Sequence, residues 1–276
     1  MTTTMSLRIV VCAKEVLDPD AVNNYALEGR LVIGDDGKSL TQSSIPRLMN
    51  AYDEQAIEAA LRIREAGMTC TITVVSVGDP GEILKHAAAL GADELIAIQA
   101  DTAATDHHGI ARILAAFVAS RGGAELVLCG RQASDDDQGV VPALLGEHLG
   151  MPVVTIARAI DVAENGGSFD VRVVRVTPDG DETVTVPAPA VVTISNEIGT
   201  PRYPTMVGRM AARKKKITVV TTADLGLAAD ALRPRVTLVR QFVPIVKGAC
   251  EVIDAATAAE AATRLIARLR AENVLR

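Results

Sequence analysis

Aromatic residues are scarce in this chain of 276 residues, which has no tryptophan, three phenylalanines and three tyrosines. Proteins that bind nucleic acids use aromatic side chains for base stacking and a basic surface for the phosphates. This chain has few rings for stacking, and its net charge is −6 at pH 7. We therefore predict that it does not bind nucleic acid.

Long apolar runs are absent as well. No run approaches the roughly 18 residues that a membrane-spanning helix requires. The first residues, MTTTMSLRIVVCAKE, do not combine a basic stretch with a long apolar stretch, as a secretory signal does. These absences predict no membrane insertion and a location in the cytoplasm.

The four cysteines are widely spaced. Cys12, Cys70, Cys129 and Cys250 form no Cys-x-x-Cys pair and no cysteine and histidine cluster with metal-ligand spacing. Three of them lie within apolar runs of the kind that form strands. We predict reduced, buried thiols and no metal site.

Several catalytic motifs are missing. The sequence has no G-x-x-x-x-G-K-[ST] loop, and VGDPGE is too short for G-x-G-x-x-G. It also has no G-x-S-x-G elbow, and the histidines have no marked serine or cysteine partner. We therefore predict no catalytic residue. Surface or capping roles are expected for the histidines, which are His86, His107, His108 and His148.

Apolar residues make up 49% of the chain, and alanine, valine, leucine and isoleucine must fill its core. Short β-branched runs alternate with segments of helical spacing, which predicts parallel strands joined by right-handed helical crossovers. The expected strands are 7–12, 70–77, 94–98, 126–129 and 153–156, and the expected helices are 51–66, 80–90, 110–120 and 140–149.

Three segments depart from this alternation. Residues 18–48 predict a small hairpin or excursion after the first strand, because glycine-bounded turns flank a short apolar run. Period-two patterns at 171–176 and 183–186 predict an antiparallel hairpin, after which 190–194 returns to a continuous apolar strand. Residues 224–276, with one helix near 256–272, have little core-forming pattern.

Ligands of open parallel sheets collect beyond the carboxyl ends of the strands, here after Cys12, Val77 and Cys129. The third of these loops is GRQASDDDQG and leads into a helix, so its N–H groups are suited to an anion and its aspartates to hydroxyls. A nucleotide cradle is one interpretation. A solvated acidic cap formed by Asp135, Asp136 and Asp137 is the alternative, and a metal site is a weaker one.

The segment TPRYPTMVGRMAARKKKITVV is unusual because it combines two prolines, two methionines and a basic run. Flexible methionines on an exposed loop suit adaptable partner docking. For the basic residues, Arg213 to Lys216, a solvated helix end is an equally good interpretation.

Six segments occur in the order and spacing of a known family: VVCAKEVLD, MNAYDEQAIEAA, VVSVG followed by ALGAD, LCGRQASDDD, PAVVT and PRYPTMVGRMAARKKKI. Over about residues 7–227 the chain resembles the electron transfer flavoprotein β subunits. The resemblance implies a doubly wound, mainly parallel α/β sheet of the adenine nucleotide α hydrolase-like (Rossmann-like) type. It also implies a nucleotide-binding domain at 1–223, with a recognition loop at about 196–213, and a C-terminal arm at 224–276 that packs on a partner subunit.

The resemblance further implies a heterodimer with an α subunit that holds most of the FAD site. The complex would pass electrons from flavin dehydrogenases to a quinone-reducing or other redox acceptor, and the chain alone would not be an enzyme. AMP, or with less support a second FAD, is expected in the β subunit. The implied cofactor-binding residues are Cys12, Ala13, Lys14, Asn50, Tyr52, Val77, Ala133, Asp136, Gln138, Gly139, Val140 and Val141.

By the same resemblance, the partner-docking residues are Pro201, Arg202, Tyr203, Met206 and Met210, with Met206 as the apolar anchor for the dehydrogenase. Tyr52 matches a family position near the partner's flavin, and a core aromatic is its alternative role.

The chain departs from the family after the acidic triplet. In an ungapped match it has Val140, Val141 and Pro142 where the family usually has glutamine, then threonine, serine or valine, then glycine. Pro142 has no N–H to donate to a phosphate. A one-residue realignment would bring Gln138 and Gly139 nearer to the family's positions.

Two other functions fit the broad fold. A free-standing adenine-nucleotide-binding module or sensor would use the same cradle without a partner subunit. An ATP-cleaving ligase or hydrolase would need a glycine-rich loop after the first strand, where CAKEVLDP has Lys14 and no glycine.

Overall fold

The computed structural model describes residues 5–41, 43–244 and 250–275. The chain divides into two compact units between Gln241 and Phe242. The first unit therefore extends past residue 223, where we expected the α/β domain to end. Leu225, Leu227 and Leu232 pack against its core, which explains the extension.

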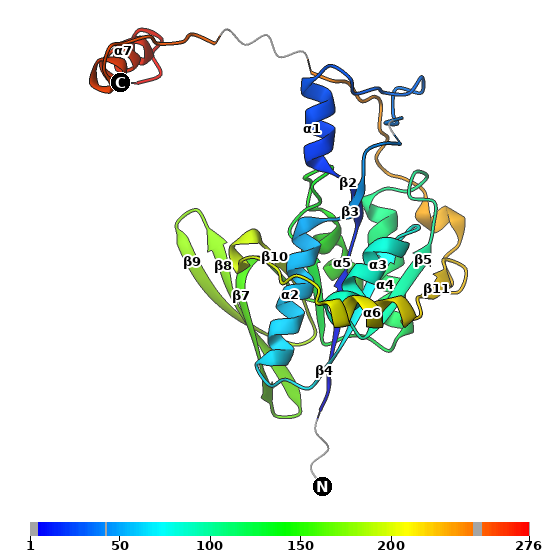
Figure 1. Ribbon diagram of the computed structural model, residues 1–276. Coiled ribbons are helices and arrows are strands. Elements are labelled where there is room, and N and C mark those ends of the chain that lie inside the picture. Colours follow the sequence, from blue (N-terminus) through cyan, green and yellow to red (C-terminus); the bar gives the residue numbers. More distant parts are fainter. Residues whose placement is uncertain (1–4, 42, 245–249, 276) are drawn as a thin grey trace. The chain divides into compact units, whose positions relative to one another are not determined.

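A nine-stranded sheet forms the first unit, in the order β11-β5-β4-β1-β6-β10-β7-β8-β9 (Figure 1). The strands from β11 to β7 are parallel, whereas β8 and β9 are antiparallel additions. The strands of this sheet are β1 (Leu7–Cys12), β4 (Cys70–Val77), β5 (Glu94–Gln99), β6 (Leu126–Gly130), β7 (Val153–Asn165), β8 (Ser168–Thr177), β9 (Gly180–Pro187), β10 (Ala190–Ile194) and β11 (Thr218–Thr221).

Helices cover both faces of this sheet. One apolar cluster contains side chains of α2, α3 and α6, and the other contains side chains of α4 and α5. The fold is thus doubly wound, as the family resemblance implied. These helices are α2 (Ala51–Glu65), α3 (Gly81–Leu90), α4 (His107–Ser120), α5 (Val141–Leu149) and α6 (Met206–Lys214).

The chain reverses its direction across the sheet at β1. It proceeds from β1 to β4 and β5, then returns through α4 to β6 on the other side of β1. Such a reversal opens a crevice at the carboxyl ends of the two strands that flank it. The fold therefore places a ligand site beyond Cys12 and Gly130.

The excursion after β1 contains more structure than we predicted. Asp18 caps a helix, α1 (Pro19–Leu27), by accepting hydrogen bonds from the N–H groups of Asp20 and Ala21. A hairpin-like turn follows, with a bridge between Ile33 and Leu40. The excursion ends in a small antiparallel pair of β2 (Glu15–Leu17) and β3 (Arg47–Met49).

Two further predictions were incomplete. The methionine-bearing segment is not a loop throughout, because α6 begins at Met206 with Thr205 as its N-cap. The strand expected at 153–156 continues to Asn165, since β8 pairs with it. The described part of this unit also contains two short 3-10 helices, η1 (Asn196–Ile198) and η2 (Ala229–Leu232).

In its described residues the second unit contains one helix, α7 (Ala258–Ala271), capped by Thr257 within the range where we expected it. None of its described residues is buried, and Leu265 and Ile266 are among its exposed apolar side chains. Residues 245–249 and 276 of the predicted arm lie outside the described residues. Packing of this arm on a partner subunit stays a prediction. Among the described residues, no helix is long and apolar enough to cross a membrane.

Candidate functional site

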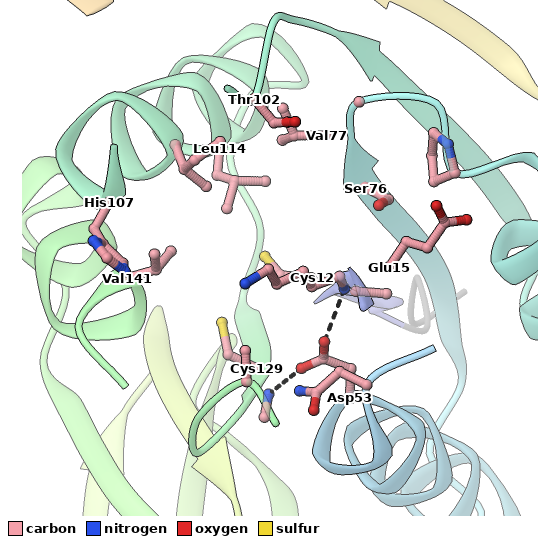
Figure 2. Close-up of a pocket in the computed structure, with 18 of the residues that line it drawn as sticks. Cys12, Glu15, Asp53, Ser76, Val77, Thr102, His107, Leu114, Cys129 and Val141 are labelled. Atoms are coloured by element: carbon pink, nitrogen blue, oxygen red, sulfur yellow. Dashed lines mark hydrogen bonds between the residues drawn. The ribbon is translucent and has the colours of Figure 1, made fainter. Parts of the chain in front are cut away.

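A cavity of about 360 Å³ opens at the carboxyl ends of β1, β4 and β6 (Figure 2). Its walls come from the loops after these strands, the first turn of α4 and the first residues of α5. This volume lies toward the lower end of the range for small-molecule sites, roughly 300–1,000 Å³. The cavity occupies the crevice that the reversal of strand order predicts.

Asp53, on the first turn of α2, joins two of these loops. Its carboxylate accepts hydrogen bonds from the N–H of Lys14 at 2.8 Å and the N–H of Gly130 at 2.9 Å (Figure 2). Asp53 is buried, and burial raises its pKa to about 6 against the hydrogen bonds, which lower it. The side chain thus fixes the ends of β1 and β6 relative to α2.

Asn50, the N-cap residue of α2, holds the loop after β6 in the same way. Its side-chain amide donates to the carbonyl of Gln132 at 2.8 Å, and its side-chain oxygen accepts from the N–H of Ser134 at 3.2 Å. Asn50 is 1% exposed, so these bonds are shielded from water. The start of α2 therefore supports the loop after β6, residues 130–139, which we call the cradle loop.

Two glycines are required by this packing. A Cβ on Gly130 would lie 2.4 Å from a carboxylate oxygen of Asp53 and 2.9 Å from the backbone of Tyr52. Gly139 has a φ of +61°, and a Cβ there would lie 2.6 Å from the carbonyl oxygen of Arg131. The cradle loop keeps its path only with glycine at these positions.

Charged side chains connect three loops at the cavity. The ammonium group of Lys14 lies 2.7 Å from Asp135 and 3.5 Å from Asp136, and the imidazole of His107 lies 3.2 Å from Asp136. Burial opposes ionisation of Asp136, but the Lys14 charge, the N–H of Gln138 and the nearby His107 hold its pKa below the usual value. The acidic triplet precedes α5 rather than forming its first turn, and two of its members pair with Lys14.

An unpaired polar group shows that the cavity suits a polar ligand. Ser76 is 1% exposed and lines the cavity, yet its hydroxyl has no hydrogen-bond partner within the described part of the chain. Buried hydroxyls are normally paired, so a ligand that bonds Ser76 would remove an unfavourable term. Together with Lys14, this donor set fits a phosphate-bearing nucleotide.

The start of α5 also faces the cavity. Val140, Val141 and Pro142 are among its lining residues, and α5 begins at Val141. Free N–H groups at a helix start attract anions, but Pro142 supplies none. This end of the cavity therefore offers fewer phosphate donors than a helix without proline.

The structure brings together most of the predicted cofactor-binding residues. Tyr52 and Gln138 are not among the lining residues, and Arg131 stacks over the Tyr52 ring at 5.7 Å from its centre. A role for Tyr52 near a partner's flavin stays a prediction. The predicted residues that line the cavity are Cys12, Ala13, Lys14, Asn50, Val77, Ala133, Asp136, Gly139, Val140 and Val141.

Sequence reasoning missed a second group of lining residues, because long-range folding brings them in. The segment from β5 to α4 bears no motif, and Asp53 looks like an ordinary first-turn acid. A signal did exist for Ser76 and Gly130, which lie at the carboxyl ends of strands whose following loops we had selected. The missed residues include Asp53, Ser76, Thr102, Thr105, Asp106, His107, Ile110, Leu114, Cys129 and Gly130.

The four cysteines differ in burial, whereas we predicted that the thiols would be buried. Cys12 and Cys129 are buried and line the cavity, Cys70 is half-buried, and Cys250 is exposed. All four lie in the described residues and none forms a disulfide. Among those residues, no group of three or more His, Cys, Asp or Glu side chains could hold a metal ion.

A second feature is an exposed apolar surface, formed by side chains of α6 and by Tyr203, which lies shortly before the N-cap Thr205. We call Tyr203, Met206, Val207 and Met210 the docking surface; their exposed fractions run from 65% to 85%. Large apolar side chains gathered in one exposed segment are typical of an interaction site.

Arg202 has a different position from the other predicted docking residues. Its guanidinium turns toward α2, where it pairs with Glu58 at 2.7 Å and with Glu65. These carboxylates raise the pKa of Arg202, and the arginine in turn holds the pKa of the buried Glu58 below its usual value, against the effect of burial. Arg202 thus fastens residues 200–205, which precede α6 and which we call the docking segment, to α2.

Comparison with known proteins identifies the family. The model of the electron transfer flavoprotein domain matches residues 39–225, more than half of the chain. The chain belongs to the electron transfer flavoprotein family. Membership implies association with flavin as FAD.

Relatives in the family are similar over most of their length. The caffeyl-CoA reductase-Etf complex subunit CarD of Acetobacterium woodii is 32% identical over 280 residues, covering 98% of this chain and 100% of the relative. The electron transfer flavoprotein subunit beta of Mycobacterium leprae is 34% identical over 233 residues, covering 80% and 82%. The corresponding subunit of Syntrophomonas wolfei is 33% identical over 223 residues, covering 79% and 81%. These matches confirm the predicted β type, and with it a role in electron transfer.

Proposed function

We propose that the chain is the β subunit of a heterodimer whose α subunit holds most of the FAD. The complex carries electrons from flavin dehydrogenases to a downstream acceptor, and the β chain has no catalytic activity of its own. The observation that carries this proposal is the docking surface, because an electron carrier needs an exposed apolar site for the dehydrogenases that deliver its electrons. The proposal places the complex in the cytoplasm. A stand-alone nucleotide-binding module gives this surface no role.

The proposal assigns an adenine nucleotide to the cavity, with AMP ahead of a second FAD. A volume of about 360 Å³ suits a mononucleotide better than a dinucleotide with twice as many rings. Lys14 would hold the phosphate, and the cradle loop would enclose the nucleotide. FAD, held mainly by the α subunit, supplies the electron-accepting chemistry.

Nucleotide extraction tests this assignment. The purified heterodimer is denatured, and the released nucleotides are identified by mass and quantified against the protein. We expect one FAD and one AMP for each heterodimer. Two FAD molecules would overturn the choice of AMP, and one FAD without any second nucleotide would overturn nucleotide binding in the cavity.

Replacement of Lys14 by glutamine tests how the phosphate is held. We expect AMP to bind about tenfold more weakly, equivalent to ~1.4 kcal/mol, because one charge-assisted hydrogen bond is lost. Binding of adenosine, which has no phosphate, should hardly change. Calorimetric titration measures both, and Lys38→Gln in the exposed turn of the excursion is the control. Equal losses for AMP and adenosine would contradict a phosphate contact.

Replacement of Met206 by alanine tests the docking surface. Met206 is 75% exposed, and loss of an interface anchor typically weakens binding by about 2 kcal/mol, or ~30-fold. We expect that loss in the affinity of the heterodimer for a cognate dehydrogenase, measured from the concentration dependence of electron transfer. Flavin content should stay the same. Leu27→Ala, at an 86% exposed position on α1, is the matched control; equal effects of both variants would argue against this surface.

A further inference from the structure

Two cysteine thiols meet at the switch point of the sheet. Cys12 ends β1, and Cys129 is the penultimate residue of the neighbouring parallel strand β6. The residues before them, Val11 and Leu128, are paired in register, so the two cysteines are also neighbours across the strands. Their side chains belong to the same apolar cluster and therefore lie on the same face of the sheet.

The Cys12 thiol lies close enough to Cys129 to affect its titration. A hydrogen bond with the Cys12 thiol, followed by burial, raises the pKa of the Cys129 thiol well above its usual value. The nearby Asp53 carboxylate acts in the same direction. Cys129 is therefore a protonated thiol at neutral pH, held against its neighbour.

The backbone positions are compatible with a covalent bond. Neighbouring strands lie roughly 4.7–4.9 Å apart, within the range of about 4.4–6.8 Å for the Cα atoms of disulfides. Both cysteines line the cavity, so a small molecule reaches the pair from solvent without unfolding of the sheet (Figure 2). The exposed fraction is 9% for Cys12 and 4% for Cys129, which excludes larger oxidants.

We propose that Cys12 and Cys129 form a site of reversible oxidation by small hydroperoxides, which ends in a disulfide across the inner end of the cavity. This inference rests on the strand register and the cavity alone. It holds whether or not AMP is the cavity's ligand.

The reaction balances with one hydroperoxide. The sulfur of Cys12 attacks the terminal peroxide oxygen, the O–O bond breaks, and Cys12 becomes a sulfenic acid while the thiol proton leaves with the other oxygen as water or alcohol. The Cys129 sulfur then attacks the Cys12 sulfur and displaces the hydroxyl, which takes the Cys129 proton and leaves as water. The two thiols are oxidised and the peroxide is reduced. Cys12 acts first because it is the more exposed of the two thiols.

The consequence of this bond is local to the cavity. The two sulfurs would be drawn together between the ends of β1 and β6, the same two segments that Asp53 holds by hydrogen bonds. Cys70 and Cys250 do not line the cavity. They serve as internal controls for unspecific oxidation.

The test treats the purified full-length chain with stoichiometric hydrogen peroxide. We expect the intact mass to fall by two hydrogen atoms, peptide mapping to join Cys12 to Cys129, and a thiol reductant to restore the original mass. The variant lacking both other cysteines, Cys70→Ser with Cys250→Ser, should still form the bond, and Cys12→Ser should lose it.

The mapping of the wild-type chain decides the question even if a cysteine variant fails to fold. Addition of oxygen atoms to Cys12 or Cys129 without a link between them would overturn the proposal. Oxidation confined to Cys70 and Cys250 would overturn it as well.

Discussion

Replacing Arg202 with alanine will lower the free energy of unfolding by about 3 kcal/mol, because it leaves the Glu58 carboxylate buried with one partner fewer. The Glu58 side chain is 7% exposed and accepts hydrogen bonds from the backbone N–H and the guanidinium of Arg202. Arg62 still pairs with Glu58 at 2.8 Å, which keeps the loss at the lower end for a broken buried pair. Urea denaturation measures the change.

The same substitution will release the docking segment from α2. Amide hydrogen exchange at the non-proline residues of 200–205 should become faster, because Arg202 joins this segment to both Glu58 and Glu65. Arg121→Ala is the control, since its pair with Glu94 is exposed on both sides and worth at most about 1 kcal/mol. A loss for Arg202→Ala no greater than that of the control would contradict the anchoring role.

Replacing Asp53 with asparagine will change how stability depends on pH. The folded pKa of Asp53 is raised from 3.8 to about 6, so the group favours the folded state most below pH 3.8, and that contribution is lost as pH rises through 6. Asparagine keeps the shape of the protonated acid but does not titrate. Between pH 4 and pH 7 the difference in unfolding free energy should shift by about 2 kcal/mol in favour of the variant.

Denaturation of both chains across this pH range tests the prediction. Glu58, Glu125 and Asp136 have lowered pKa values and act in the opposite direction, but they are common to both chains and cancel in the difference. Asp161→Asn, at an exposed pair with Arg172, is the control and should show no such shift. A difference that stays constant with pH, or that grows in favour of the wild type, would contradict a buried Asp53 with a raised pKa.

The sheet could be predicted from the sequence because its strands are continuous apolar runs and its helices repeat with helical spacing. The strand Leu7–Cys12 and the helix Ala51–Glu65 are examples in which local pattern and tertiary role agree. The start of helix α6 was missed because Pro201 and Pro204 suggest an extended chain, whereas Thr205 caps a helix immediately after them. Capping depends on one side chain, and its effect does not appear in a helix propensity that is averaged over the whole segment.

The site was only partly predictable for a different reason. Family motifs located the loops after β1, β4 and β6, but long-range contacts decide which side chains face the cavity. His107 reaches Asp136 across 29 residues, and Asp53 reaches Gly130 across 77. Arg202 looked like a docking residue by its position in the motif, and its guanidinium turns to α2 because Glu58 and Glu65 lie on the facing side of that helix. Such long-range pairings cannot be predicted until the fold is known.

The most direct test of the proposed function is the visible absorption spectrum of the chain purified with and without a co-expressed α-type partner. We expect a yellow complex with one flavin spectrum when both subunits are present, and bleaching of that spectrum when a reduced cognate dehydrogenase is added. The β chain alone should show no flavin absorbance. A chain that stays apart from every α-type partner, or a complex without FAD, would contradict the account.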